Sequence, residues 1–375
     1  MGALTADEFD LSALRRWPDV EAPNLHAVDA SDRLILDEAG AALRESGPGG
    51  VGVIGDNYGA LTIGVAALSG ATGIRVFQDS LVAERALAAN TDGHIGYENL
   101  PLGTELLRGA RVVLMQLPRS LAELEELAAW ISACADPSAR VYAGGRIKHM
   151  TLAMNEVLAR HFGRVDVSHA RQKSRVLIAS EARGGETPTL AREFHTDLGI
   201  WVCATGATFA GTRIDIGTRA LLGALPAVAP DATTAADLGC GSGVVAAVLA
   251  RARPELSVLA SDVSAGAVAS AVATAEANGL SNVTVTRDDA LAEQPDSSLD
   301  LVVLNPPFHL GATVHTGAAS KLFAAAARVL KPGGELVTVY NSHLGYRAEL
   351  TRVVGDTDEL SRNPKFTVTR SRKRG

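Results

Sequence analysis

The chain has 375 residues, of which 47% are hydrophobic and 21% charged, and its formal net charge is −7. This length exceeds one ordinary domain and favours two compact α/β domains, while no charge-free apolar stretch reaches the about 18 residues of a membrane span. The three cysteines, Cys134, Cys203 and Cys240, have neither the spacing of a metal site nor the number of a disulfide framework, so no metal is expected.

The chain begins with an acidic stretch without a signal-peptide pattern, which predicts a cytoplasmic protein. A buried strand then covers 51–54 and enters a turn that contains Gly55 and Gly59, followed by an apolar helix. A strand, a glycine turn and a helix in this order are typical of loops that hold a nucleotide cofactor. Because Tyr58 stands between only two glycines, this loop is either a working cofactor loop or the remnant of one.

Basic residues are concentrated between positions 140 and 175. This stretch contains eight Lys and Arg but only two acidic residues, although the whole chain has a net negative charge. Such a run is either a solvated surface or a patch that contacts the phosphates of a nucleic acid. The candidates for RNA binding are Arg146, Lys148, Arg171 and Lys173.

A short polar segment precedes a predicted helix between Ala207 and Leu225. Gly217 permits a close turn there, and Thr218 is expected to cap the helix. Capping alone accounts for Thr218.

The second half contains the sequence DLGCGSG between a strand and a helix, and the next strand leads to an acid. Glycines let the backbone approach a ligand closely, and an acid about 20 residues later can hold ribose hydroxyls. The sequence DLGCGSG resembles motif I of class I S-adenosylmethionine-dependent methyltransferases, which implies S-adenosylmethionine as the cofactor. The candidate cofactor residues in this unit are Asp237, Gly239, Gly241, Gly243 and Asp262.

Two more strands follow, and each ends in residues of functional interest. The first is followed by Asp289 and Ala290, where a fold of this kind holds the adenine. The second covers 299–304 and ends at Asn305 in the sequence NPPF. Because proline cannot continue a strand ladder, Asn305 is expected to project at the carboxyl edge of the sheet, where open α/β folds bind ligands.

The NPPF sequence suits methylation of a planar exocyclic amine. The Asn305 side-chain carbonyl and the Pro306 backbone carbonyl can each accept one N–H of that amine, orienting its nitrogen and stabilising the charge that develops on it. Phe308 offers a face on which a base can stack. The candidate catalytic residues are therefore Asn305, Pro306, Pro307 and Phe308, with no metal required, and Asn305 is also a candidate cofactor residue.

Four stretches of the chain resemble the RsmC/RlmG family of bacterial ribosomal RNA guanine-N2 methyltransferases: GTRIDIGTRALLGALP, ADLGCGSGV, LNPPFH and VLKPGGELVTVYNSHLGYRAEL. The stretch 341–368 is more similar to the large-subunit branch. The resemblance implies methyl transfer from S-adenosyl-L-methionine to a guanine N2 amine, with ribosomal RNA or a ribosomal subunit as partner. It also implies that the segment containing Phe209 and Gly217 covers the cofactor.

The first half matches the second along most of its length, which indicates a tandem repeat of one fold. Asn57 takes the place of Gly241, Gln116 that of Asn305, and Asp79 is aligned with Asp262. The first copy also lacks the acid of motif I, so its glycine turn is interpreted as a decayed cofactor loop. The prediction is an α/β monomer built as a tandem duplication of a Rossmann-like class I methyltransferase fold, degenerate in residues 1–185 and catalytic in 186–375.

Three classes of function remain open from the sequence. The favoured one is a guanine-N2 methyltransferase of 23S ribosomal RNA, with 16S as the other acceptor. The second is an enzyme of the same fold that methylates tRNA adenine N6 or a protein glutamine, and the third is a non-catalytic RNA-binding protein. The degenerate copy is expected to position RNA, or else to serve as a stabilising lid without an RNA role.

Overall fold

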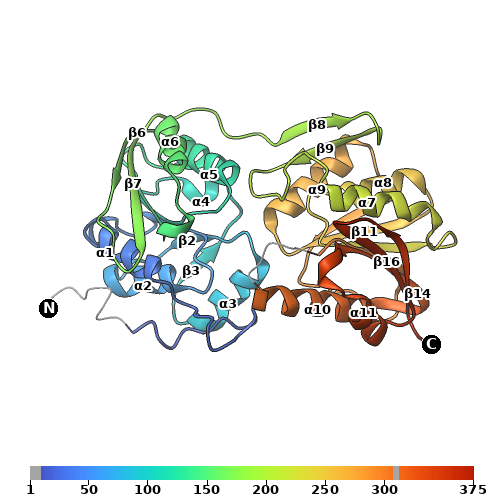
Figure 1. The fold of residues 1–375 in the computed structure, drawn as a ribbon. Helices are drawn as coiled ribbons and strands as arrows, with labels where there is room; N and C mark the ends of the chain where they lie inside the picture. The colour runs from blue at the N-terminus through green and yellow to red at the C-terminus, as the bar shows by residue number, and fades with distance from the viewer. Residues whose placement is uncertain (1–9, 307–311) are drawn as a thin grey trace. The chain divides into compact units, whose positions relative to one another are not determined.

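The computed structural model describes residues 10–306 and 312–375, so the predictions for Pro307 and Phe308 lie outside the described residues. The chain forms two compact units, the first ending at Thr189 and the second spanning Leu190–Gly375 (Figure 1). Within the described ranges, no helix is both long and apolar enough to cross a membrane.

The first unit is built on a seven-stranded sheet with the order β3-β2-β1-β4-β5-β7-β6. The first five strands of this order run parallel, and β7 runs antiparallel to both of its neighbours. The strands are β1 (Val51–Ile54), β2 (Ile74–Phe77), β3 (Tyr97–Asn99), β4 (Val112–Gln116), β5 (Arg140–Arg146), β6 (Phe162–Val167) and β7 (Ser174–Ala182).

Helices cover both faces of this sheet and bury a separate apolar core on each. The core on one face joins the sheet to α1 (Ala30–Glu45), α2 (Ala60–Ser69) and α3 (Leu81–Thr91). The core on the other face joins it to α4 (Thr104–Leu107), α5 (Leu121–Cys134) and α6 (Leu152–His161). A short 3-10 turn, η1 (Ile147–His149), follows β5.

The second unit repeats this sheet strand for strand, in the order β12-β11-β10-β13-β14-β16-β15. Its strands are β10 (Thr234–Leu238), β11 (Ser257–Asp262), β12 (Val283–Arg287), β13 (Leu299–Leu304), β14 (Leu330–Asn341), β15 (Thr357–Arg362) and β16 (Phe366–Arg372). A separate hairpin of β8 (Ala191–His195) and β9 (Ile200–Ala204) precedes them. The shared order confirms the prediction of a tandem Rossmann-like arrangement.

The helices of the second unit are also divided between the two faces of its sheet. One face packs against α7 (Ile216–Ala224), α8 (Val244–Ala252) and α9 (Ala265–Ala277), and the other against α10 (Ala312–Val329) and α11 (Arg347–Val353). The 3-10 turns η2 (Leu225–Ala227) and η3 (Ser342–Leu344) complete the unit.

Strand β13 shows why the sequence forms a central strand. Leu301 and Val303 face one core while Val302 and Leu304 face the other, and all four are fully buried. A continuous apolar run of this kind is typical of parallel strands that are covered on both faces. The first polar residue after the run, Asn305, therefore comes at the carboxyl edge of the sheet, as predicted.

The strand registers correct one part of the alignment between the two copies. Ile54 pairs with Phe77 in the first unit, and Leu238 pairs with Ser261 in the second. The residue that corresponds to Asp262 is therefore Gln78, and the expected match with Asp79 is wrong by one position. The match with Asp79 rests on residue type, whereas the pairing of neighbouring strands determines the actual register.

Candidate active site

The loop after β10 is shaped by three glycines in the left-handed region, with φ of +74° at Gly239, +52° at Gly241 and +77° at Gly243. A Cβ at Gly239 or Gly241 would meet no atom within 4 Å, so open space lies beside these positions. A Cβ at Gly243 would instead lie 3.0 Å from Ala271 of α9. The first two glycines leave room for a ligand, and the third lets α8 and α9 approach each other closely.

Asp262 ends β11 and is held by the backbone on two sides. One carboxylate oxygen accepts from the Gly241 amide at 3.0 Å, and the other accepts from the Ser264 amide at 3.0 Å. Each oxygen of a carboxylate has a second lone pair, so the group can also accept from two neighbouring hydroxyls. Asp262 is therefore suited to accept from ribose hydroxyls, which is the role that the sequence assigned to it.

Asp237 lies on β10 and is buried beneath the glycine loop. Its Oδ2 accepts from the Ala246 amide at 3.0 Å, which satisfies one of the unpaired N–H groups at the start of α8. Burial raises the pKa of this carboxyl to about 7, and the nearby charge of Asp262 acts in the same direction. A cationic ligand beside the loop would favour the ionised form.

The turn after β12 holds the pair assigned to the adenine. Both carboxylate oxygens of Asp289 accept from the Lys321 ammonium of α10 at 2.6 Å. Ala290 follows with a φ of +58°, and the strand register pairs Arg287 with Asp262. This turn therefore lies at the same sheet edge as Asp262.

The segment before α7 is attached to α9. The Thr205 amide donates to the Ser270 hydroxyl at 3.0 Å, and the Thr208 hydroxyl lies 2.7 Å from the same oxygen. Phe209, the next residue, keeps 63% of its surface exposed. A large exposed aromatic that is fixed beside the helix following Asp262 is suited to covering a bound ligand.

Helix α7 is capped by Asp215, and the expectation that Thr218 is the capping residue is wrong. One Asp215 oxygen accepts from the amides of Gly217 at 2.7 Å and Thr218 at 3.2 Å. The Thr218 hydroxyl donates to the other oxygen at 2.5 Å. Either residue type can cap a helix, and here the acid stands at the capping position while the threonine lies within the first turn.

Asn305 is held by the same carboxylate and hydroxyl. Its Nδ2 donates to Thr218 Oγ1 at 3.1 Å and lies 3.4 Å from Asp215 Oδ2. Its Oδ1 is buried and has no hydrogen-bond partner among the described residues. A buried carbonyl without a donor is unfavourable by about 1–3 kcal/mol, so this oxygen is suited to accept from a bound ligand.

The corresponding loop of the first unit keeps the backbone turns but has different contacts. Gly55, Asn57 and Gly59 have φ of +71°, +59° and +100°, matching the three glycines of the second unit. Asp56, one residue after Gly55, is buried and accepts from the amides of Leu61 at 2.6 Å and Thr62 at 2.8 Å. An acid in the loop thus caps α2, a task that Asp237 performs from the strand in the second unit.

A segment ahead of α1 lies across this loop. The Tyr58 hydroxyl donates to Asp19 at 2.6 Å, and the Arg16 guanidinium lies 4.6 Å from the centre of the Tyr58 ring. Asn90 binds both the Arg15 carbonyl, at 2.8 Å, and the Tyr58 carbonyl, at 2.7 Å. We name residues 15–19 the covering segment; it packs on the loop at the side chain that replaces the small Ser242 of the second unit.

The four candidate RNA-binding residues lie in one region of the first unit. The Arg146–Ser174 register pair and the bond from the Ile147 amide to the Lys173 carbonyl bring the end of β5 beside the turn before β7. Lys148 and Lys173 are exposed, whereas Arg146 pairs with Asp29 at 3.1 Å and Arg171 pairs with Asp37. We name Arg146, Lys148, Arg171 and Lys173 the cationic patch.

Arg119 is a further cation near the cationic patch, and it was not predicted as a site residue. Desolvation lowers the pKa of His149, and the charges of Arg119, Lys148 and Arg146 beside it lower that pKa further. Arg119 is exposed and follows β4, the parallel neighbour of β5. Arg119 follows Gln116 by three residues, as Phe308 follows Asn305, so the alignment of the two copies was the signal in the sequence that could have identified it.

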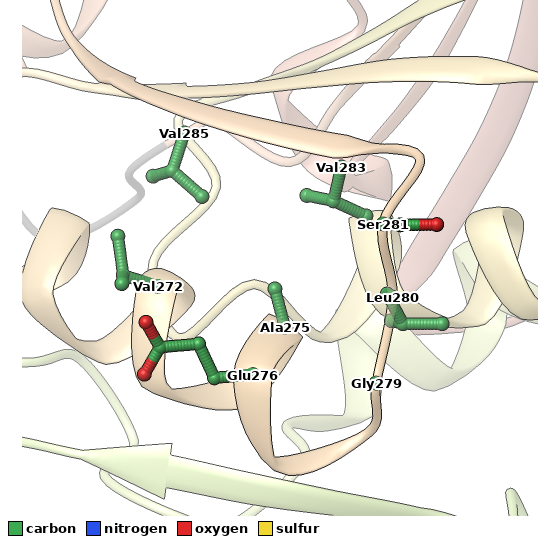
Figure 2. Close-up of a pocket in the computed structure, with 8 residues that line it drawn as sticks. All are labelled: Val272, Ala275, Glu276, Gly279, Leu280, Ser281, Val283 and Val285. Carbon is green, nitrogen blue, oxygen red and sulfur yellow. The ribbon is translucent and has the colours of Figure 1, made fainter.

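A shallow groove of about 360 Å³ lies between α9 and the edge strand β12 of the second unit (Figure 2). Its apolar lining includes Val272 and Ala275 of α9 and Val283 and Val285 of β12. Val283 begins its strand, so the groove extends toward the amino ends of the strands rather than the carboxyl edge that carries Asp262 and Asn305. No site residue lines this groove.

Comparison with known families divides the chain at the same place. Residues 3–183 match the family model described as the RLMG N-terminal domain. Residues 199–370 match the model described as the methyltransferase small domain.

Similar proteins match along almost the whole chain. A ribosomal RNA large subunit methyltransferase G from Ectopseudomonas mendocina is 34% identical, covering 96% of this chain and 97% of the relative. A protein of the same name from Streptomyces avermitilis is 33% identical with the same coverage.

A solved structure shares the two-unit fold. The 16S rRNA N2 G1207 methyltransferase RsmC of T. thermophilus, in complex with AdoMet and guanosine, aligns with a TM-score of 0.71. The alignment covers 90% of this chain and 92% of that protein at 20% identity, and therefore supports the fold alone.

The raised pKa of Asp237 predicts a pH-dependent gain of stability in Asp237→Asn. The unfolded carboxyl ionises near 3.8 and the folded one near 7, so the wild type loses stability as the pH rises between these values. Asparagine keeps an acceptor for Ala246 and does not ionise. The melting temperature of the variant should exceed that of the wild type at pH 8, and the difference should shrink as the pH falls toward 4. An equal difference at pH 8 and pH 5 would show that the carboxyl pKa is not raised.

Proposed function

The chain belongs to the family of ribosomal RNA large subunit methyltransferases G and is an S-adenosylmethionine-dependent rRNA methyltransferase, and we propose that its second unit holds both the methyl donor and the acceptor guanine. It transfers a methyl group to the N2 amine of a guanine in 23S ribosomal RNA.

The observation that carries the acceptor side of this proposal is the buried Oδ1 of Asn305, which lacks a donor among the described residues. One N–H of the guanine N2 amine would satisfy it, and the carbonyl of the buried Pro306 would accept the other. Two acceptors turn the nitrogen toward the methyl donor and stabilise the positive charge that grows on it. Pro307 and Phe308 complete the acceptor site in this proposal, with Phe308 stacking on the base.

On the donor side, S-adenosylmethionine supplies an activated methyl group. Gly239 and Gly241 leave open space in which the cofactor can contact the backbone of the loop, and Asp262 accepts from the ribose hydroxyls of the cofactor. Asp237 supports the loop from below, while Gly243 brings α9 close to it. Asp289 and Ala290 bind the adenine, and Phe209 with Gly217 closes the segment over the ligand.

The first unit positions the RNA in this proposal. A guanine must leave its stack to reach Asn305, at a cost of a few kcal/mol that phosphate contacts elsewhere can offset. The cationic patch lies at the carboxyl edge of the first sheet, where two lysines are exposed and Arg119 adds a further charge. The arginines of the patch would exchange their partners Asp29 and Asp37 for phosphates.

Two broader properties follow from this proposal. An enzyme whose substrate is ribosomal RNA would act in the cytoplasm, either on the RNA or on the ribosomal subunit. One chain carries both a positioning unit and a catalytic unit, so we propose that it acts as a monomer.

The donor site predicts that Asp262→Ala weakens S-adenosylmethionine binding. Hydrogen bonds to a charged group are worth about 1.5–3 kcal/mol, so the dissociation constant should rise about 10- to 100-fold. Isothermal titration calorimetry measures it.

Asp79→Ala is the matched control, because it removes an acid one residue beyond the counterpart of Asp262 in the first unit. This variant should bind one S-adenosylmethionine per chain with unchanged affinity. Two bound molecules per chain would contradict the decayed first loop, and wild-type affinity in Asp262→Ala would remove that residue from the site.

The acceptor site predicts a loss of turnover in Asn305→Ala with little change in S-adenosylmethionine affinity. The lost carbonyl acts on the amine in the transition state, and one such contact typically accounts for about 10²–10³ in rate. Transfer of tritiated methyl groups to an unmodified 23S transcript measures turnover, and nucleoside analysis of the product identifies the methylated base.

Gln116→Ala provides the control for this variant, since Gln116 holds the same place in the first unit. Its turnover should equal that of the wild type. If Asn305→Ala kept most of its activity, other groups would have to orient the amine and the proposed mechanism would be wrong.

The positioning role predicts a change in salt dependence when all four residues of the cationic patch are replaced by Gln. Each lost phosphate contact should reduce the slope of log affinity against log salt by about 0.7–0.9, whatever the RNA sequence. S-adenosylmethionine binding should be unchanged. Filter binding over a salt series measures the slope.

A charge-matched control replaces Arg108, Arg111, Arg140 and Arg160 with Gln. Arg111 and Arg140 stand at the amino ends of β4 and β5, opposite the edge that carries the cationic patch. A general effect of net charge would lower the slope equally in both quadruple variants. Wild-type slope in the patch variant would leave the first unit as a scaffold without an RNA role.

A further inference from the structure

The helices α1 and α7 begin with the same short pattern, an acid followed four residues later by arginine, at Asp29–Arg33 and Asp215–Arg219. Asp29 begins α1 and Asp215 begins α7. Each carboxylate accepts from the amide two residues ahead, at 2.9 Å in the first unit and 2.7 Å in the second. Two helices of equivalent position are therefore capped in the same way.

The helix start also holds an amide side chain in both units. The residue three beyond the cap is Asp32 in the first unit and Thr218 in the second, and each accepts from the amide nitrogen at the carboxyl edge. Those nitrogens belong to Gln116 and Asn305. Because one end of each amide is bound in this way, its carbonyl oxygen faces the opposite direction.

The units differ in what meets that carbonyl oxygen. In the first unit the Ser31 hydroxyl lies 3.2 Å from Gln116 Oε1 and 3.0 Å from Asp29 Oδ1, so its single proton is shared between these two acceptors. Gly217 takes the place of Ser31 in the second unit, and a Cβ there would lie 3.6 Å from Asn305 Oδ1. The acceptor that a serine closes in the first unit is thus left open in the second.

We propose that Gly217 keeps the Asn305 carbonyl open for the acceptor amine, and that Asp215 and Thr218 are positioning residues that fix the direction of the Asn305 amide. This inference rests on the proposed function, because it assigns the donor to a guanine amine. The first unit differs at this point, because the Ser31 side chain stands beside the corresponding carbonyl of Gln116.

The test compares Gly217→Ser with Gly217→Ala in the full-length protein. Both variants add the same Cβ, which would contact Asp215 at 3.0 Å and Phe366 at 3.3 Å, but only serine adds a hydroxyl donor. The kcat of Gly217→Ser on an unmodified 23S transcript should fall at least about tenfold below that of Gly217→Ala. The affinity for S-adenosylmethionine should agree within about twofold between them.

The matched control is Ser31→Ala, which opens the carbonyl of the first unit and should leave kcat unchanged. Asp215→Asn tests the positioning role. Its side-chain oxygen still caps α7, while its new amino group faces Asn305 and favours the reversed amide. Its kcat should fall about as far as that of Asn305→Ala, with KM for S-adenosylmethionine and melting temperature close to the wild type.

The outcomes distinguish a failure of this inference from a failure of the proposed function. Equal kcat in Gly217→Ser and Gly217→Ala, or full turnover in Asp215→Asn, would overturn the inference while leaving the proposed function intact. A wild type that methylates no guanine would overturn the proposed function and this inference with it. Thr218→Val removes the hydroxyl at nearly constant size and serves as the test should a Gly217 variant fail to fold. Its kcat should fall while its KM for S-adenosylmethionine stays close to that of the wild type.

Discussion

The carboxylate of Asp215 meets two requirements at once, and the active edge of the second unit depends on it. A helix start leaves backbone N–H groups without acceptors, so α7 needs a capping group whatever the enzyme does. The same carboxylate reaches Asn305, 90 positions further along the chain. A demand of secondary structure therefore determines the direction of an amide at the site, and no additional element is needed to hold it.

The two units show that the same fold can be kept while the residues around the loop differ. In both loops three residues have φ in the left-handed region. At the start of each following helix, a backbone amide donates to a buried acid. In the second unit this acid is Asp237 on the strand, which leaves the loop to the ligand. In the first unit it is Asp56 within the loop. Both helices are therefore capped by an acid, although that acid stands at a different position in each unit.

Much of the fold could be predicted because it depends on local pattern. The apolar run 299–304 and the two prolines after it specify a central strand and the place where it ends. The glycines after Asp237 specify the turn. What could not be predicted are contacts between distant residues: the register that pairs Phe77 with Ile54, and the bond from Asn305 to Thr218. Both arise from packing of elements that are far apart in sequence, so neither leaves a local signal.

The covering segment is tied to the loop of the first unit at several points. Tyr58 holds Asp19 and stacks beneath Arg16, while Asn90 binds the backbone of both the covering segment and the loop. Restoring a glycine at position 57 and a serine at position 58 would recreate a permissive loop under a chain that still lies across it. Such changes would remove the Tyr58 contacts of Asp19 and Arg16, although these two residues would still pair with each other at 2.6 Å. A ligand entering that loop would therefore have to displace the covering segment, which Asn90 still holds through the Arg15 carbonyl.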